Sequence, residues 1–171
     1  MQGFVQVYTG DGKGKTTAAL GLALRAAGAG LRVYIGQFIK NAGYSELTTL
    51  YRLADGITVQ QFGRGCFLLN APCQADIDAA HAALAALGAV LASGAFDLVI
   101  ADEINVACAL GLINEQDILD LITRRPAAVE LVLTGRGAPA SVIERADLVT
   151  EMRPIKHYYE QGVLARKGIE S

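Results

Sequence analysis

Short apolar runs alternate along the chain with segments of helical periodicity. Six runs are rich in β-branched, Leu and aromatic residues, as strands are. They cover residues 4–8, 32–39, 57–62, 97–101, 129–134 and 147–152. The runs around 98–101 and 131–133 are almost continuously apolar, which is typical of central strands covered on both faces.

The segments between these runs predict helices. Apolar residues recur at helical spacing between Gln74 and Ser93, and shorter helices are predicted over residues 18–25, 115–123 and 140–145. Because strands and helices alternate, we expect an α/β fold with a mostly parallel central sheet and helices on both faces. The length predicts one domain over residues 1–171.

A glycine-rich segment lies between the first strand and the first helix. It reads Thr9-Gly10-Asp11-Gly12-Lys13-Gly14-Lys15-Thr16-Thr17. Such glycines let the backbone turn tightly and aim several N–H groups at one anion, so the segment predicts a phosphate-binding loop and a P-loop NTPase-like fold. Lys15 offers a positive charge to phosphate oxygens, and the Thr16 hydroxyl suits Mg²⁺. The first glycine of the usual GxxxxGK[ST] pattern is replaced by Thr9, which indicates an unusual loop of this class.

Four predicted strands carry suggestive residues at their carboxyl ends, where parallel sheets bind ligands. They are followed by the glycine-rich loop, by residues 40–44, by Asp102 and Glu103, and by residues 134–137. Adjacent strand residues point to opposite faces, so one of the two carboxylates is expected to hold Mg²⁺ opposite Thr16. Arg136 lies between two glycines and is expected to neutralise a polyphosphate leaving group. A solvated acidic turn and a surface arginine are the alternatives.

Composition narrows the class of protein and its partners. The chain is 52% hydrophobic and 19% charged with a net charge of −2, which indicates a globular protein and gives no sign of nucleic-acid binding. We expect no membrane-spanning segment and no signal peptide, hence a cytoplasmic protein. Cys66, Cys73 and Cys108 form no CxxC pair, so they are expected to be buried or half-buried thiols rather than disulfides or zinc ligands. His81 is expected on a helix surface.

Five motifs occur in order along nearly the whole chain. They are the loop at 9–17, Gln37-Phe38-Ile39-Lys40, Asp102-Glu103-Ile104, Thr134-Gly135-Arg136-Gly137 and Arg153-Pro154-Ile155-Lys156-His157. Together they resemble the P-loop type of ATP:corrinoid adenosyltransferase. Each motif alone is modestly specific, whereas the five in this order and spacing are highly specific.

The resemblance implies an activity and a set of ligands. The family transfers the 5′-deoxyadenosyl group of ATP to the Co(I) centre of a reduced corrinoid and releases triphosphate, in adenosylcobalamin synthesis or salvage. It implies Mg²⁺ (or Mn²⁺), a flavoprotein reductant and a homodimer. It assigns ATP to residues 9–17 and Arg25, the metal to Thr16 with Glu103 or Asp102, and catalysis to Lys15, Glu103 and Arg136.

The segment after the third predicted strand departs from the family pattern. The resemblance assigns corrinoid binding to Arg64, Cys66, Phe67 and Leu68, where better-known members have a Phe and a Trp, and this chain has no Trp. Cys66 and Leu68 take those places. The departure implies either a different corrinoid preference or a pocket rebuilt around Phe67, whose alternative role is to pack a core or loop.

Two other functions fit the same residues. A P-loop NTPase or phosphotransferase would use the loop, the metal ligands and Arg136 equally well. A non-catalytic corrinoid carrier would bind both ligands with little turnover. Product identity separates them from the transferase, which releases intact triphosphate only when a reduced corrinoid is present.

Overall fold

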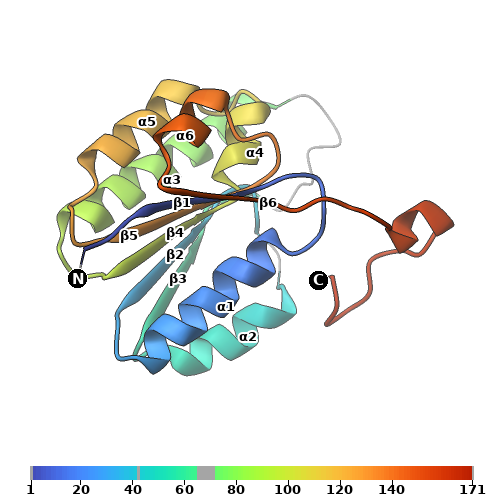
Figure 1. Cartoon of the computed structure of the whole chain (residues 1–171), viewed down its shortest axis with the longest axis horizontal. Helices are drawn as coiled ribbons and strands as arrows, with labels where there is room; N and C mark the ends of the chain where they lie inside the picture. Colours follow the sequence, from blue (N-terminus) through green and yellow to red (C-terminus); the bar gives the residue numbers. More distant parts are fainter. Residues whose placement is uncertain (1, 42, 65–71, 171) are drawn as a thin grey trace.

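The computed structural model describes residues 2–41, 43–64 and 72–170 and contains a six-stranded sheet (Figure 1). The strands are β1 (Val5–Thr9), β2 (Val33–Gln37), β3 (Ile57–Gln61), β4 (Leu98–Asp102), β5 (Glu130–Thr134) and β6 (Leu148–Glu151). Neighbouring strands pair in parallel in the order β3-β2-β4-β5-β1-β6. The predicted α/β fold is confirmed, and each predicted strand is present with slightly shifted ends.

Helices cover both faces of the sheet (Figure 1). They are α1 (Lys15–Gly28), α2 (Ser45–Leu50), α3 (Gln74–Ala92), α4 (Ile104–Ala109), α5 (Glu115–Arg124) and α6 (Ala140–Arg145), with short 3-10 turns η1 (Tyr51–Leu53) and η2 (Tyr158–Gln161). The predicted helices correspond to α1, α3, α5 and α6. The sequence analysis did not predict α2 and α4, which have six residues each.

Alternation along the central strands divides the core into two layers. In β4, Leu98 and Ile100 pack with α1 and α2, whereas Val99 and Ala101 pack with the helices of the opposite face. All four side chains are buried. Burial on both faces explains why this strand reads as a continuous apolar run.

Helix α3 passes the length and composition test for a membrane span, although the sequence analysis expects no membrane-spanning segment. One such helix is weak evidence for a membrane span. Its residues Ala83, Leu87 and Leu91 are buried in the core against the sheet, and His81 is exposed on its surface as expected.

The thiols are only partly as expected. Cys108 is half-buried, but Cys73 is exposed, and both are free. Cys73 is exposed because it is the N-cap of α3, at the surface, where its Sγ accepts a hydrogen bond of 3.4 Å from Arg64. Cys66 lies outside the described residues.

Candidate active site

The phosphate-binding loop, residues 9–17, is shaped by the segment that follows β6. The Gly12 N–H donates a 2.7 Å hydrogen bond to the Met152 carbonyl, and the Met152 N–H donates one of 2.9 Å to Thr9. A Cβ on Gly10 or Gly12 would lie 2.5 or 2.7 Å from the Met152 oxygen. Glycine is therefore required at both positions by the close approach of another backbone, and Gly10 also has a φ of 91°.

Helix α1 begins directly at the end of this loop. Its N-cap is Gly14, with a φ of 120°, and among the described residues no side chain caps it, so its first N–H groups can receive an anion. The Lys15 ammonium, on a residue only 8% exposed, donates to the carbonyls of Gly10 and Gly12 at 2.7 and 2.6 Å. Burial, with the charge of Arg136, lowers the pKa of Lys15. The N–H groups of the first turn of α1 and the buried Lys15 ammonium thus lie together at the end of the loop.

Asp102 ends β4 and is the centre of the polar network. Asp102 is only 1% exposed to solvent. Oδ1 accepts hydrogen bonds from Thr16 Oγ1 at 2.8 Å and Thr134 Oγ1 at 2.7 Å. Oδ2 accepts from Gln37 Nε2 at 3.1 Å and from Lys40 Nζ at 2.8 Å. The carboxylate therefore joins the first turn of α1 to the ends of β2 and β5 and to the loop after β2.

Lys40 forms a largely buried ion pair with Asp102. Its side chain is 14% exposed, and Nζ also donates to Thr16 Oγ1 at 3.2 Å. The ammonium lies 5.4 Å from the centre of the Tyr44 ring. Burial alone would lower the pKa of Lys40, but the charge and hydrogen bond of Asp102 hold that pKa above its ordinary value. The sequence placed Lys40 in a motif but gave it no role; its position directly after a strand was the available signal.

Two non-glycine residues with left-handed backbones flank this ion pair. Ile39, with a φ of 63°, precedes Lys40, and Glu103, with a φ of 64°, follows Asp102. Such conformations cost about 1–3 kcal/mol each and are kept where the surroundings require them. The strain sets the direction in which the chain leaves β2 and β4.

Glu103 lies half-buried beside the network. Its N–H donates a 2.9 Å hydrogen bond to Thr134 Oγ1. Burial and then the Asp102 charge raise the pKa of Glu103, while Lys40, Lys15 and Arg136 act in the opposite direction. Of the two predicted carboxylates, Asp102 is the one that contacts Thr16; Glu103 interacts with the cations at longer range.

The turn after β5 carries Arg136. Gly135 has a φ of 128°, and a Cβ there would lie 2.9 Å from the Val106 nitrogen. The buried Asn105 amide donates a long 3.5 Å bond to the Gly135 carbonyl. Arg136 is exposed and interacts electrostatically with Lys15 and Glu103. The turn thus presents a guanidinium to the same end of the sheet.

Other predicted site residues are exposed to solvent. Asp11, Lys13 and Thr17 are exposed, and Lys13 Nζ donates to the Ile169 carbonyl at 2.8 Å. Arg25 is in the last turn of α1, about 15 Å from Lys15 along the helix axis at a rise of about 1.5 Å per residue. The structure therefore does not bring Arg25 to the phosphate-binding loop.

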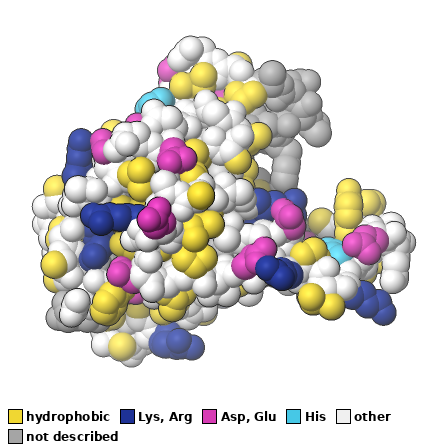
Figure 2. Space-filling view, turned by 45° about the horizontal axis from the view of Figure 1, so that its top comes forward, with side chains coloured by type: hydrophobic (Ala, Val, Ile, Leu, Met, Phe, Trp, Pro, Cys, Tyr) yellow, Lys and Arg dark blue, Asp and Glu magenta, His cyan; other side chains and the backbone are white. Residues whose placement is uncertain are grey.

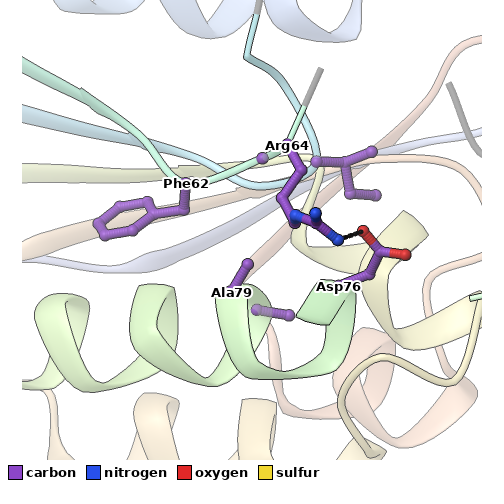
Figure 3. A pocket seen from close by; sticks show the side chains of 7 residues that line it. Phe62, Arg64, Asp76 and Ala79 are labelled. Atoms are coloured by element: carbon purple, nitrogen blue, oxygen red, sulfur yellow. Dashed lines mark ion pairs between the residues drawn. The ribbon is translucent and has the colours of Figure 1, made fainter. Parts of the chain in front are cut away.

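A second hollow lies on the other side of Ile39. It is lined by Ile39, Phe62, Gly63, Arg64, Asp76, Ala79 and Ala80 (Figure 3). Arg64 reaches across it from the end of β3 to Asp76 on α3, with 3.8 Å between Nη1 and Oδ1. Of the residues predicted to bind the corrinoid, only Arg64 is at this hollow; Cys66, Phe67 and Leu68 lie outside the described residues.

The network has the chemistry of a divalent-ion site. Within residues 2–41, 43–64 and 72–170, no group of three or more His, Cys, Asp and Glu could hold a metal without other ligands. However, the Asp102 carboxylate and the Thr16 hydroxyl are hard oxygen ligands of the kind that Mg²⁺ shares with substrate phosphates. The Lys40 ammonium contacts both oxygens, so a cation fits between them.

The chain resembles known proteins over nearly its whole length. The family model for ATP:corrinoid adenosyltransferase BtuR/CobO/CobP matches residues 1–171. The chain is 38% identical over 170 residues to the corrinoid adenosyltransferase of Pseudomonas aeruginosa, covering 99% of this chain and 84% of that protein. It is 33% identical over 169 residues to the corrinoid adenosyltransferase of Escherichia coli K12, covering 99% and 86%.

A solved structure supports the fold. The KaiC-like protein from Pyrococcus horikoshii OT3 superposes with a TM-score of 0.60 at 21% identity, covering 99% of this chain and 76% of that one. At that identity the likeness concerns the fold alone. The family match and the two relatives extend over almost the whole sequence, so this chain belongs to the ATP:corrinoid adenosyltransferase family.

Proposed function

We propose that this protein transfers the 5′-deoxyadenosyl group of ATP to the Co(I) centre of a reduced corrinoid and releases triphosphate. The observation that carries the proposal is the match of residues 1–171 to a family described by this reaction. The loop, the buried carboxylate and the cations at one sheet edge supply what the reaction needs. It would serve adenosylcobalamin synthesis or salvage.

The reaction is an alkylation at carbon. The Co(I) electron pair attacks C5′ of the ribose, the Co–C bond forms, and the C5′–O bond breaks with its electrons leaving on triphosphate. No general base is needed, because the nucleophile is the substrate metal itself. The protein must hold C5′ in line with the cobalt and stabilise the charge on the departing triphosphate.

Several residues around the phosphate-binding loop are proposed to stabilise the charge on the departing triphosphate. Loop amides and the N-terminus of α1 receive phosphate oxygens, and the desolvated Lys15 ammonium neutralises part of their charge. Arg136, exposed on the turn after β5, is proposed to neutralise part of the charge on the leaving group. Burial excludes water from these contacts and strengthens them.

Asp102 and Thr16 are proposed as the residues that hold Mg²⁺ or Mn²⁺, with Glu103 beside them. A divalent ion there would neutralise charge on the triphosphate. The half-buried Glu103 contributes a second carboxylate whose charge is favoured once a divalent ion is close.

The corrinoid is proposed to bind at the side of Ile39 that carries Arg64. Arg64 is exposed, is held at the end of β3 by Asp76, and lies beside Phe62 (Figure 3). The roles of Cys66, Phe67 and Leu68 in displacing the lower axial ligand remain predictions. Variants at these positions are the direct way to examine how a chain without Trp does this.

An anaerobic assay tests the function. The protein is mixed with ATP, Mg²⁺ and chemically reduced cob(I)alamin; the loss of Co(I) absorbance is followed and the phosphate product is identified. We expect a light-sensitive adenosylcorrinoid and intact triphosphate. Hydrolysis of ATP to diphosphate without adenosylation would favour a P-loop NTPase instead. Binding of both ligands with less than one turnover would favour a corrinoid carrier.

We further propose a cytoplasmic homodimer that receives its Co(I) substrate from a flavoprotein reductant. These proposals follow from the family resemblance. Light scattering coupled to gel filtration tests the dimer, and exchange of the chemical reductant for a reduced flavodoxin-type protein tests the reductant.

A further inference from the structure

The ammonium of Lys40 is held by the same two side chains that would hold a divalent ion. Nζ lies 2.8 Å from Asp102 Oδ2 and 3.2 Å from Thr16 Oγ1, and these two side chains are the oxygen ligands proposed for the metal. A divalent ion bound to these side chains would lie close to the Lys40 ammonium and be repelled by it. Metal binding by Asp102 and Thr16 therefore competes with ion pairing by Lys40.

We infer that Lys40 is a triphosphate-binding residue that Asp102 holds as a counter-ion until a divalent ion takes its place. The inference rests on the proposed function for the identity of the substrate. The exchange itself concerns only this chain, a divalent ion and a polyphosphate. When the ion binds Asp102, the Lys40 ammonium loses its anion and the triphosphate becomes the nearest replacement.

The position of Lys40 supports the second half of this exchange. Its Nζ is already within hydrogen-bond distance of Thr16 in the first turn of α1, where the loop amides converge. A four-carbon stem needs only a change of rotamer to move its head group from one side of Thr16 to the other. The left-handed backbone of Ile39 fixes where that stem begins.

Asp102 remains satisfied without Lys40. Its oxygens still accept hydrogen bonds from Thr16, Thr134 and Gln37, at 2.8, 2.7 and 3.1 Å. A variant that lacks the lysine charge thus keeps three donors on the carboxylate and exposes it to an added metal ion. This makes the exchange measurable without any corrinoid.

Mn²⁺ binding to the nucleotide-free protein is the test. Free Mn²⁺ is measured by electron paramagnetic resonance with the natural protein, Lys40→Met, Lys40→Arg and Lys167→Met, the last removing an exposed lysine charge in the C-terminal tail. We expect Lys40→Met to bind Mn²⁺ at least about tenfold more tightly than the natural protein, since a competing charge is gone. Lys40→Arg and Lys167→Met should stay close to the natural value. Equal Mn²⁺ affinity in Lys40→Met and the natural protein would overturn the exchange.

ATP binding tests the phosphate contact separately. With Mg²⁺ present, Lys40→Met should bind ATP about tenfold more weakly, the loss expected for one charge-assisted hydrogen bond. Unchanged ATP affinity would overturn the assignment of Lys40 to triphosphate. Neither measurement uses a corrinoid, so failure of adenosyl transfer and failure of the exchange are distinguishable.

A measurement on the natural protein covers the case in which Lys40→Met does not fold. The five lysines are labelled with ¹³C at Cε, and the Lys40 signal is identified by its loss in Lys40→Arg. Mg²⁺ alone should shift this signal and leave that of Lys167 in place. A Lys40 signal that does not move at saturating Mg²⁺ and ATP would contradict the inference.

Discussion

The phosphate-binding loop packs against the residue that follows β6, and the C-terminal tail, residues 152–170, continues from the same point, but the two are held in opposite ways. The loop is fixed by backbone approach, with Gly12 bonded to the Met152 carbonyl and Lys15 only 8% exposed. The tail extends from the body (Figure 1) and carries apolar side chains on its surface (Figure 2). Among them Ile155 is 92% exposed and Leu164 is 75% exposed. Buried polar contacts make the first region preorganised, whereas the second has few contacts to restrain it.

The largest effect is expected from Asp102→Asn, which removes the charge at the centre of the polar network beside the phosphate-binding loop. Lys40 would be left buried without its anion, a loss worth about 3–5 kcal/mol of unfolding free energy. Adenosyl transfer should fall by at least about a hundredfold, because the proposed metal ligand is lost. Denaturant unfolding and the anaerobic assay measure both.

Asp78→Asn is the matched control, because Asp78 is exposed on α3. Its unfolding free energy should stay within about 0.5 kcal/mol of the natural value. If Asp102→Asn is no less stable than this control, the buried ion pair does not contribute as described.

A methyl group on the loop tests the backbone approach itself. Gly12→Ala would place Cβ 2.7 Å from the Met152 oxygen, so we expect a loss of at least about 1 kcal/mol and weaker ATP binding. Gly21→Ala, inside α1 with open space around its Cβ, should instead gain up to about 1 kcal/mol. Both variants replace glycine by alanine. Urea unfolding should show a lower unfolding free energy for Gly12→Ala and a higher one for Gly21→Ala. A change in the same direction for both would mean that the close backbone approach does not restrict residue 12.

Glu103→Gln separates stability from function. Burial and Asp102 raise the folded-state pKa of Glu103, so its contribution to stability is fully present below the unfolded-state pKa and is lost as pH rises through the folded-state pKa. The glutamine variant should lack this decline and be more stable at neutral pH, while its transfer rate falls at least about tenfold. Thermal unfolding at several pH values with the metal chelated checks the sign. A natural protein that grows more stable through this range while the variant does not would contradict it.

The smallest effect is expected where the tail meets the loop. Lys13→Gln removes the hydrogen bond from Nζ to the Ile169 carbonyl, and an exposed contact of this kind should change the unfolding free energy by less than about 0.5 kcal/mol. Limited proteolysis should cut the tail somewhat faster. A loss above 1 kcal/mol, set against Lys167→Gln as control, would mean that the tail is docked more firmly than its exposure indicates.

Local sequence patterns predicted the strands and the phosphate-binding loop. The apolar runs gave the strands, and the glycine pattern gave the loop, since both depend on short stretches of sequence. A carboxylate opposite Thr16 was expected because strand ends meet at one edge, but the sequence did not decide between Asp102 and Glu103; in the structure Asp102 contacts Thr16. Thr134 was not assigned to this contact, because only the strand order shows that β5 lies between β4 and β1.

Non-local contacts explain what the sequence did not predict. The pairing of Lys40 with Asp102 depends on β2 lying next to β4, which the order of strands in the chain does not reveal. Arg25 was assigned to ATP by resemblance; it lies in the last turn of α1, away from the phosphate-binding loop, and its assignment to ATP stays a prediction. The exposure of Cys73 depends on where α3 begins at the surface.

The tight contact at Gly63 has a consequence for how this chain can evolve. A Cβ at that position would lie 1.9 Å from the Ile39 oxygen and 2.5 Å from the Lys40 nitrogen, and the Gly63 N–H donates to the Lys40 carbonyl at 3.0 Å. Any side chain introduced at residue 63 would push the backbone that carries Lys40. Under the proposed corrinoid position, any change of corrinoid preference around Arg64 must leave residue 63 without a side chain, because the backbone that carries Lys40 depends on it.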